Sequence, residues 1–193
     1  MKKMKTLFKR TFDSGHVANT VNEVTPGCEW VLQGEGKATQ KLDGTCCLIK
    51  DGKLYARFDY KPGRKLPDGA IPCQEEADPI TGHFPHWVEV KDQPQYKWHK
   101  IAFENSTGLE DGTYELIGEH FANNPEKVEH GDILVKHGSI ILDNVGRDYD
   151  SIKEYLRTHY IEGIVFHREN GDMCKIKRTD FNFEWNGKTF KQH

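Results

Sequence analysis

Long apolar runs are missing from this sequence of 193 residues. A membrane-spanning helix needs about 20 consecutive apolar residues, and no segment of the chain approaches that length. Residues 1–10 contain five basic side chains, but no apolar segment of about 7–15 residues follows them, which argues against a secretory signal. Hydrophobic residues make up 36% and charged residues 30% of the chain, as in globular proteins. We therefore expect a soluble protein of the cytoplasm.

The cysteines lack the number and the spacing of a disulfide framework. There are five, and no C-x-x-C pair occurs among them, so we expect free thiols in a reducing compartment. His83 and His86 have H-x-x-H spacing. A second ligand pair is missing nearby, which leaves structural zinc as the weaker alternative. The cysteines are Cys28, Cys46, Cys47, Cys73 and Cys174.

An excess of positive charge is also missing, because 27 Lys and Arg stand against 30 Asp and Glu, a net charge of −3. Nucleic-acid-binding domains are often basic. However, an enzyme that holds a strand end needs only a local basic groove, so the average excludes little. A basic cluster within residues 1–10 has two interpretations, contact with phosphates or a solvated, partly disordered terminus. It consists of Lys2, Lys3, Lys5, Lys9 and Arg10.

The sequence shows no repeats and no low-complexity tract, and we expect one domain over residues 1–193. Short apolar or alternating segments predict a largely β structure. Asp51-Gly52 and Asn170-Gly171 each stand between two such segments and predict hairpins. The expected β segments are 29–32, 38–49, 53–60, 87–90, 113–118, 133–135, 140–142, 161–167 and 173–178, with 133–135 and 140–142 forming a further hairpin.

One helix is predicted after residue 150. Asp150 or Ser151 can cap it, and four apolar or aromatic residues then mark one face at helical spacing. Residues 61–85 are rich in Pro, Gly and Asp and predict a long loop, a kind of segment that is often functional. Strands with few helices indicate the α+β class, with mostly antiparallel sheets. The helix face consists of Ile152, Tyr155, Leu156 and Tyr160.

Lys41 is the candidate nucleophile, within Lys41-Leu42-Asp43-Gly44. A lysine attacks through its neutral amine, and burial, nearby cations or a metal ion can favour that form. Gly44 lets the backbone approach a phosphate, and Asp43 can accept a hydrogen bond from a ribose or help to bind a metal ion. Three fixed residues arise by chance in roughly one chain in fifteen of this length. A surface lysine before a turn is therefore the alternative.

Four charged residues downstream strengthen the lysine hypothesis. Glu162 enters an apolar strand, and Glu115 stands within another, where a lone carboxylate is costly unless it is paired. Lys175 and Lys177 point to the same face of the next strand. Two like charges on one face are consistent with an anion bound between them. For the lysine pair a solvent-facing place on an edge strand, and for Glu115 a simple edge position, remain equally good explanations when each is taken alone.

In chain order, the lysine motif, the segments 115–118 and 162–166 and the Lys175/Lys177 pair resemble motifs I, III, IV and V of the covalent nucleotidyltransferases. That superfamily contains DNA ligases, RNA ligases and mRNA capping enzymes. A closer resemblance, over nearly the whole chain, is to the small ATP-dependent 5′-to-3′ RNA ligases of animals and their microbial relatives. The similar segments are 41–47, 56–62, 82–88, 95–99, 115–118 and 161–165, with Asn124-Pro125 and His137-Gly138.

The resemblance implies an adenylation domain without an OB domain, which joins RNA 5′-phosphate and 3′-hydroxyl ends through a lysyl-AMP on Lys41. ATP would be the AMP donor, and Mg²⁺, or Mn²⁺, would be held by Glu115 and Glu162. No protein or membrane partner is implied. Arg57 and the 61–85 loop would contact the strand end. The implied nucleotide-binding residues are Gln40, Lys41, Asp43, Gly44, Arg57, Glu115, Glu162, Ile164, Lys175 and Lys177.

The chain departs from the wider pattern at one position. Many polynucleotide ligases carry K-x-D-G-x-R, and Cys46 stands here in place of that arginine. Arg57 is the candidate to supply the missing contact. Two alternatives stay open: a GTP-using enzyme of the capping type, and a catalytically silent nucleic-acid-binding module that keeps the fold.

Overall fold

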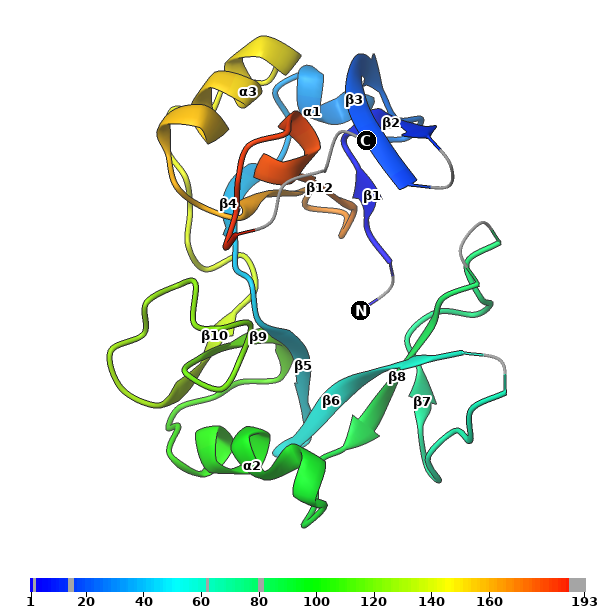
Figure 1. Ribbon diagram of the computed structural model, residues 1–193. Helices are drawn as coiled ribbons and strands as arrows, with labels where there is room; N and C mark the ends of the chain where they lie inside the picture. The colour runs from blue at the N-terminus through cyan, green and yellow to red at the C-terminus, as the bar shows by residue number, and fades with distance from the viewer. Residues whose placement is uncertain (2, 14–15, 62, 80–81, 188–193) are drawn as a thin grey trace. The chain divides into compact units, whose positions relative to one another are not determined.

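The computed structural model describes residues 1, 3–13, 16–61, 63–79 and 82–187 (Figure 1). The chain forms two compact units. Unit 1 comprises Met1–Lys3 and Asp43–His137, and unit 2 comprises Met4–Leu42 and Gly138–His193. Each unit has a sheet of its own, and each is described separately below. A single domain over residues 1–193 remains a prediction.

Unit 1 is built on a six-stranded sheet in the order β10-β9-β5-β6-β8-β7, with all neighbours antiparallel. A helix, α2, follows β8 after a short 3-10 turn at Pro94–Tyr96. The elements are β5 (Thr45–Lys50), β6 (Lys53–Tyr60), β7 (Ile71–Pro72), β8 (Phe84–Glu89), α2 (Lys97–Glu104), β9 (Gly112–Gly118) and β10 (Asp132–Lys136).

The two faces of the unit 1 sheet differ in polarity. Cys47 lies opposite Tyr114 and Ala56 in the register, and these side chains share one face with the apolar core. Ala102 of α2 packs into that core. Cys46 lies opposite Glu115 and points to the other face, because neighbouring residues of a strand alternate. The core therefore fixes which polar side chains stand together on the opposite face.

Unit 2 contains a four-stranded sheet in the order β1-β12-β11-β4. Its pairs are antiparallel except for β1, which runs parallel to β12. A β2–β3 hairpin, a short helix α1 and the helix α3 complete the unit, with a 3-10 turn at Arg178–Phe181. The elements are β1 (Lys5–Thr6), β2 (Phe8–Asp13), β3 (His16–Val24), α1 (Glu29–Leu32), β4 (Lys37–Lys41), α3 (Tyr149–Thr158), β11 (Gly163–His167) and β12 (Met173–Lys177).

One face of the unit 2 sheet is its core face. Ile164 and Ile176 are opposite each other and fully buried. They belong to the same cluster as Ile152 and Leu156 of α3. The predicted caps Asp150 and Ser151 are wrong, because Asp148, two or three residues earlier, is the cap and accepts a hydrogen bond from the Ser151 N–H at 2.9 Å. The opposite face of the sheet is left for polar side chains.

Several predicted elements are confirmed. Asp51-Gly52 joins β5 to β6 as a hairpin, and both residues have the positive φ that such a two-residue turn requires. Asn170-Gly171 joins β11 to β12. The five cysteines are free, as expected. The model is a mixed, sheet-rich α+β structure with few helices, which confirms the predicted class.

Two further predictions are wrong. Residues 29–32 form helix α1, because a helical turn lets the neighbours Trp30 and Val31 both enter the core. Residues 140–142 do not pair with β10: Ile140 and Leu142 hydrogen-bond to β4, whereas β10 pairs with β9. Within the basic terminus lie β1 and the start of β2, and both interpretations of its charge stay predictions. Lys2 lies outside the described residues.

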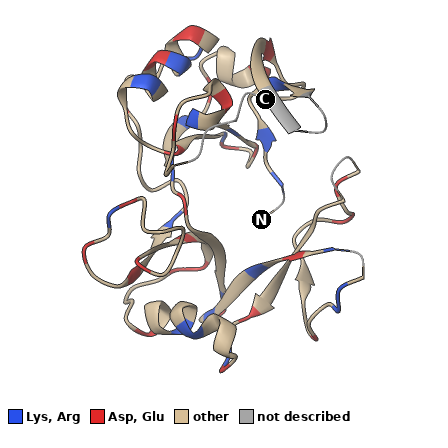
Figure 2. Ribbon diagram, viewed as in Figure 1, with Lys and Arg blue, Asp and Glu red and all other residues tan. Residues whose placement is uncertain are grey.

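Acidic and basic residues are mixed along the chain, and α3 carries both signs (Figure 2). This mixture agrees with a net charge near zero and explains why composition gave no sign of a site. Within the described ranges, no helix has both the length and the apolar character that a membrane-spanning helix requires.

Candidate functional site

Lys41 lies at the end of β4, in a row of residues that crosses the unit 2 sheet. Gly163 of β11 is opposite Lys41 on one side and opposite Lys177 of β12 on the other. Opposite residues project to the same face. A Cβ at Gly163 would lie 2.3 Å from the Ile176 carbonyl oxygen, so no other residue fits here. The glycine therefore keeps β11 close to β12 and leaves space between the two lysines.

Glu162 joins the two lysines at the entrance to β11. Its carboxylate is 3% exposed. Oε2 is 2.5 Å from Lys41 Nζ, and Oε1 is 2.8 Å from Lys177 Nζ. Lys41 Nζ also donates to the Leu42 carbonyl at 3.2 Å. A single buried carboxylate thus orients two ammonium groups, and it offsets the cost of holding them together.

Lys175 adds a third ammonium group to this face. It lies two residues before Lys177 on β12, opposite Val165. Burial, together with the charges of Lys41, Lys177 and Arg10, lowers the pKa of Lys175 to about 8. A bound anion would reverse this effect, because it would stabilise the protonated amine. The three lysines therefore form a site at which a bound anion would be stabilising.

Arg10 borders the lysine face through a buried acid that the sequence analysis did not identify. Its guanidinium donates to Asp180 Oδ1 from Nε at 2.9 Å and from Nη2 at 2.5 Å. Asp180 is fully buried and also accepts the Lys177 backbone N–H at 2.8 Å. The acid thus fixes both Arg10 and the end of β12. The two residues are 170 positions apart, so no local pattern could reveal the pair.

Gln40 and Ile164 lie on the face away from Lys41. They are opposite each other in the register, and Ile164 is fully buried in the core. The Ile164 side chain therefore cannot cover a nucleotide base, contrary to its place in the predicted site. Val165 is on the lysine face instead, 7% exposed. Alternation along β11 decides this difference, and the sequence gives both residues the same apolar character.

In unit 1, Gly44 is held against β9. A Cβ at this position would lie 2.1 Å from the Leu116 carbonyl oxygen. Its N–H donates to Glu115 Oε1 at 3.1 Å, and the Asp43 N–H donates to Glu126 Oε1 at 3.0 Å. Gly44 was predicted to let the backbone approach a phosphate closely. In the structure, its backbone closely approaches β9, and the approach to a phosphate stays a prediction.

Glu115 stands in the middle of the polar face of unit 1. Its Oε2 is 2.9 Å from His137 Nε2. Cys46 is directly opposite it on β5. Arg57 of β6 is on the same face by alternation and forms an ion pair with Asp59 at 3.1 Å. Glu115 is therefore paired, and the edge-strand alternative for it is wrong, because β9 lies between β5 and β10.

Comparison with known proteins agrees with the chemistry of both faces. A family model described as RNA ligase 1 matches residues 101–191. RNA ligase 1 of Rattus norvegicus is 26% identical in an alignment 220 residues long. That alignment covers 77% of this chain and 68% of the relative. The proteins of that name from Mus musculus and Danio rerio are 26% and 25% identical over the same share of this chain, and the alignments cover 67% and 68% of them. The chain is therefore similar to proteins described as RNA ligase 1.

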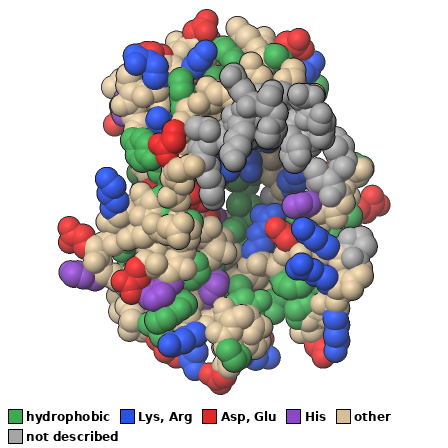
Figure 3. All heavy atoms as spheres, in the orientation of Figure 1, with side chains coloured by type: hydrophobic (Ala, Val, Ile, Leu, Met, Phe, Trp, Pro, Cys, Tyr) green, Lys and Arg blue, Asp and Glu red, His purple; other side chains and the backbone are tan. Residues whose placement is uncertain are grey.

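The part of the chain that matches the family model contains five of the predicted site residues. Glu115 comes from unit 1, and Glu162, Ile164, Lys175 and Lys177 come from unit 2. The surface seen in Figure 3 shows Lys, Arg, Asp and Glu side chains interspersed, without a uniformly basic face. Within unit 2, Lys41 and Lys177 form a local group of positive charge around Glu162, with Lys175 on the same face of the sheet.

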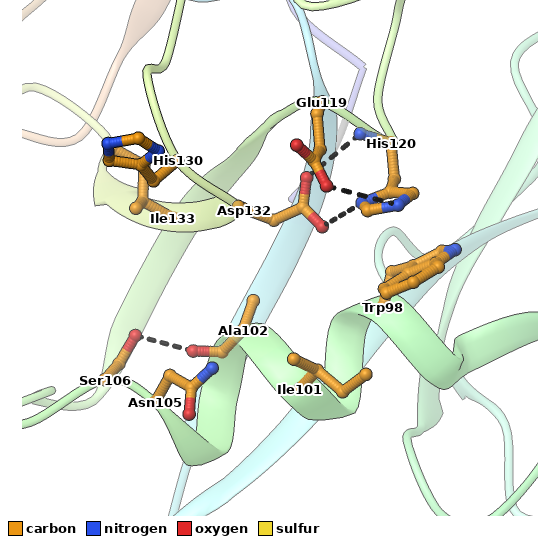
Figure 4. Close-up of a pocket in the computed structure, with 11 residues that line it drawn as sticks. Trp98, Ile101, Ala102, Asn105, Ser106, Glu119, His120, His130, Asp132 and Ile133 are labelled. Atoms are coloured by element: carbon orange, nitrogen blue, oxygen red, sulfur yellow. Dashed lines mark hydrogen bonds and ion pairs between the residues drawn. The ribbon is translucent and has the colours of Figure 1, made fainter.

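A cavity of about 260 Å³ lies elsewhere in unit 1, between α2 and the ends of β9 and β10. Figure 4 shows Trp98 stacked on His120, with ring centroids 3.4 Å apart, and His120 Nδ1 2.8 Å from Asp132 Oδ2. None of the predicted site residues lines this cavity. The cavity is therefore separate from the predicted site, although Trp98 belongs to the similar segment 95–99.

The His83/His86 zinc alternative finds no support in the described residues. His86 is 3% exposed, and its Nδ1 is 2.8 Å from the Phe84 carbonyl oxygen. That nitrogen is thus used by a local hydrogen bond within β8. The group of residues that could hold a metal ion is instead Cys46, Glu115 and His137.

Proposed function

We propose that this protein is an ATP-dependent RNA ligase that forms a covalent lysyl-AMP on Lys41. The observation that carries the proposal is the placement of Lys41 Nζ against the buried Glu162 carboxylate, with Lys175 and Lys177 on the same face of the sheet. A nucleophilic amine beside cationic groups is the arrangement that in-line attack on an anionic phosphate requires. We further propose that the chain folds as one adenylyltransferase domain.

In the first step, the neutral Nζ of Lys41 attacks the α-phosphorus of ATP. A P–N bond forms, the bond from the α-phosphorus to the bridging oxygen breaks, and pyrophosphate leaves. Lys175 and Lys177 offset the charge that develops on the α-phosphate oxygens. Glu162 holds Lys41 in position for the attack, and its negative charge keeps the two remaining cations close to the phosphate.

In the second step, an oxygen of the RNA 5′-phosphate attacks the phosphorus of the lysyl-AMP. The P–N bond breaks, Lys41 is released, and the RNA 5′ end carries AMP in a pyrophosphate linkage. In the third step, the 3′-hydroxyl of the other end attacks the 5′-phosphorus and AMP leaves. Every step is a displacement at phosphorus, so positioning and charge neutralisation account for most of the catalysis.

Carboxylate oxygens of Glu115 and Glu162 are the type of ligand that Mg²⁺ or Mn²⁺ prefers. Each oxygen of Glu162 already faces an ammonium group, so a metal ion would be held here through water rather than by direct exchange. A bound divalent ion would supply further neutralisation of phosphate charge. In unit 1, Glu115 fixes the Gly44 N–H, and we assign the contact with the strand end to Arg57.

The proposal is tested by incubating the protein with Mg²⁺ and ATP labelled at the α-phosphate, followed by denaturing electrophoresis and mass spectrometry. We expect label from ATP, not from GTP, and a mass increase of one AMP. Chains with a 5′-phosphate and a 3′-hydroxyl should then be joined, and RNA ends should be preferred to DNA ends. Label from GTP would favour a capping-type enzyme. If no label appears after pyrophosphatase treatment and after a preformed AMP adduct has been excluded, the protein is instead a catalytically silent nucleic-acid-binding module.

Nucleotide binding should weaken as the pH rises through about 8. The pKa of Lys175 is lowered to about 8 in the free protein, and a bound phosphate favours its protonated form, so binding takes up a proton. We expect the affinity for α,β-methylene ATP, which resists cleavage at the α-phosphorus, to fall about tenfold per pH unit above 8. Calorimetry in two buffers of different ionisation enthalpy would measure this uptake.

The matched variant for this test is Lys175→Arg, because a guanidinium stays protonated over this range. It should bind with a flatter pH profile. Lys153→Arg, on the exposed side of α3, should keep the wild-type slope. An affinity that is constant from about pH 7 to 9.5 in the wild type would contradict the assignment of Lys175 to the phosphate.

A further inference from the structure

Cys46, Glu115 and His137 bring three different metal-binding groups together on the polar face of unit 1. One candidate ligand atom from each residue lies within 4.8 Å of the other two. The register explains the grouping: Cys46 is opposite Glu115, and Val135, two residues before His137, is opposite Glu115 on the other side. The three residues thus come from adjacent strands and project to one face.

The hydrogen bonds of the three residues do not use every polar atom of the group. Glu115 Oε1 accepts the Gly44 N–H, and Oε2 faces His137 Nε2 at 2.9 Å. His137 Nδ1 is buried without a hydrogen-bond partner among the described residues. A buried ring nitrogen without a partner is costly. An ion bound to the group would use the polar atoms of His137 and Glu115 that now face each other at 2.9 Å.

The chemistry of the group selects the kind of ion. A thiol, an imidazole and a carboxylate are the ligands of Zn²⁺ and similar ions, and three protein ligands leave a fourth position open. Mg²⁺ prefers oxygen ligands and does not favour sulfur. In a tetrahedral zinc site the ligand atoms are about 3.3–3.7 Å apart, given metal–ligand bonds of about 2.0–2.3 Å. Side-chain movements of about 1 Å would bring the present group to that spacing.

Cys46 lies opposite Glu115 on the adjacent strand. Burial and this neighbouring carboxylate raise the pKa of the Cys46 thiol to about 12. A bound cation would stabilise the thiolate and would offset the charge of Glu115 at the same time.

We propose that Cys46, Glu115 and His137 form a binding site for a thiophilic divalent cation such as Zn²⁺. This site shares Glu115 with the carboxylates proposed for Mg²⁺ and differs from them in its thiol and imidazole ligands. It goes beyond the proposed function, since binding of the ion needs neither ATP nor RNA. An occupied site would engage Glu115, which fixes the Gly44 N–H, so the ion would act on the lysine motif through that residue.

The test uses Co²⁺ as a spectroscopic probe, added to the protein in a phosphine reductant without nucleotide. We expect a sulfur-to-cobalt charge-transfer band in the near ultraviolet and the visible bands of a tetrahedral ion, both removed by Zn²⁺. Cys46→Ser should abolish the charge-transfer band, and His137→Gln should weaken cobalt binding about 10- to 100-fold. Cys47→Ala is the matched control, because Cys47 faces the core on the same strand, and it should retain the band.

A wild-type protein without the charge-transfer band would overturn the proposal, as would a band that persists in Cys46→Ser. Loss of the charge-transfer band in Cys73→Ser, in a protein that stays folded, would place the ion at Cys73 instead of Cys46. Labelling with Mg²⁺ and ATP on the same preparation separates the two proposals. Cobalt binding without labelling would defeat only the ligase mechanism, and labelling without cobalt binding would defeat only this site.

Discussion

Lys41→Ala should abolish covalent labelling by ATP and, with it, the joining of RNA that carries a 5′-phosphate. The lysyl-AMP forms on this amine alone in the proposed mechanism, so we expect a loss of at least about a thousandfold. Lys41→Arg should be equally inactive, although it can keep the ion pair with Glu162. This pair of variants therefore separates the nucleophile from the charge. Intact-protein mass spectrometry and ligation of labelled RNA would measure both losses.

Lys37→Ala is the control for this prediction. Lys37 lies on the same strand, four residues earlier, and is exposed. It should label as the wild type does. RNA supplied with a 5′ end already carrying AMP should still be joined by Lys41→Ala, since the third step does not use the amine. Covalent AMP on another residue of Lys41→Ala would refute the assignment of the nucleophile.

Glu162→Gln should reduce labelling by about a hundredfold or more and should also destabilise unit 2. The carboxylate holds Lys41 and Lys177 at 2.5 and 2.8 Å, and a neutral amide leaves the two ammonium groups to repel each other. Loss of one partner from a fully buried ion pair costs about 3–5 kcal/mol. We expect about 1–3 kcal/mol here, because the lysine side chains are 17% and 30% exposed. Urea unfolding and single-turnover labelling would measure the two effects.

Glu169→Gln is the matched control, since Glu169 is exposed in the turn between β11 and β12. It should leave both quantities unchanged. Glu162→Asp keeps the charge with a shorter side chain and should recover part of the labelling rate. If Glu162→Gln loses stability but labels at the wild-type rate, the carboxylate only supports the fold, and its positioning of Lys41 would have to be abandoned.

Local patterns in the sequence were enough to predict the two hairpins at Asp51-Gly52 and Asn170-Gly171. Asp51-Gly52 and Asn170-Gly171 fix their turns through residues that tolerate positive φ, and alternation then sets the strands on either side. The same reasoning failed at 29–32, where four residues fit a strand or a helical turn equally well. It also missed β2, β3 and α2, whose residues carry no equally strong turn signal.

The sequence by itself determined which residues are proposed to act and the coarse structural class of this protein. Lys41, Glu115, Glu162, Lys175 and Lys177 were identified by residue type, order and family resemblance, and four of them lie within the match to the RNA ligase 1 model. These signals are local, since each motif depends on a few consecutive residues. They predicted which groups act, and the α+β class, without placing any of the groups in space.

Only the tertiary structure decided which of these groups meet and which face they share. The pairing of β11 with both β4 and β12 brings Lys41 and Lys177 to one carboxylate and turns Ile164 into the core. The same folding joins Arg10 to Asp180, 170 residues away, and sets Cys46 beside Glu115 and His137. Strand register and long-range pairing depend on the packing of the whole core, so no short segment of sequence contains them.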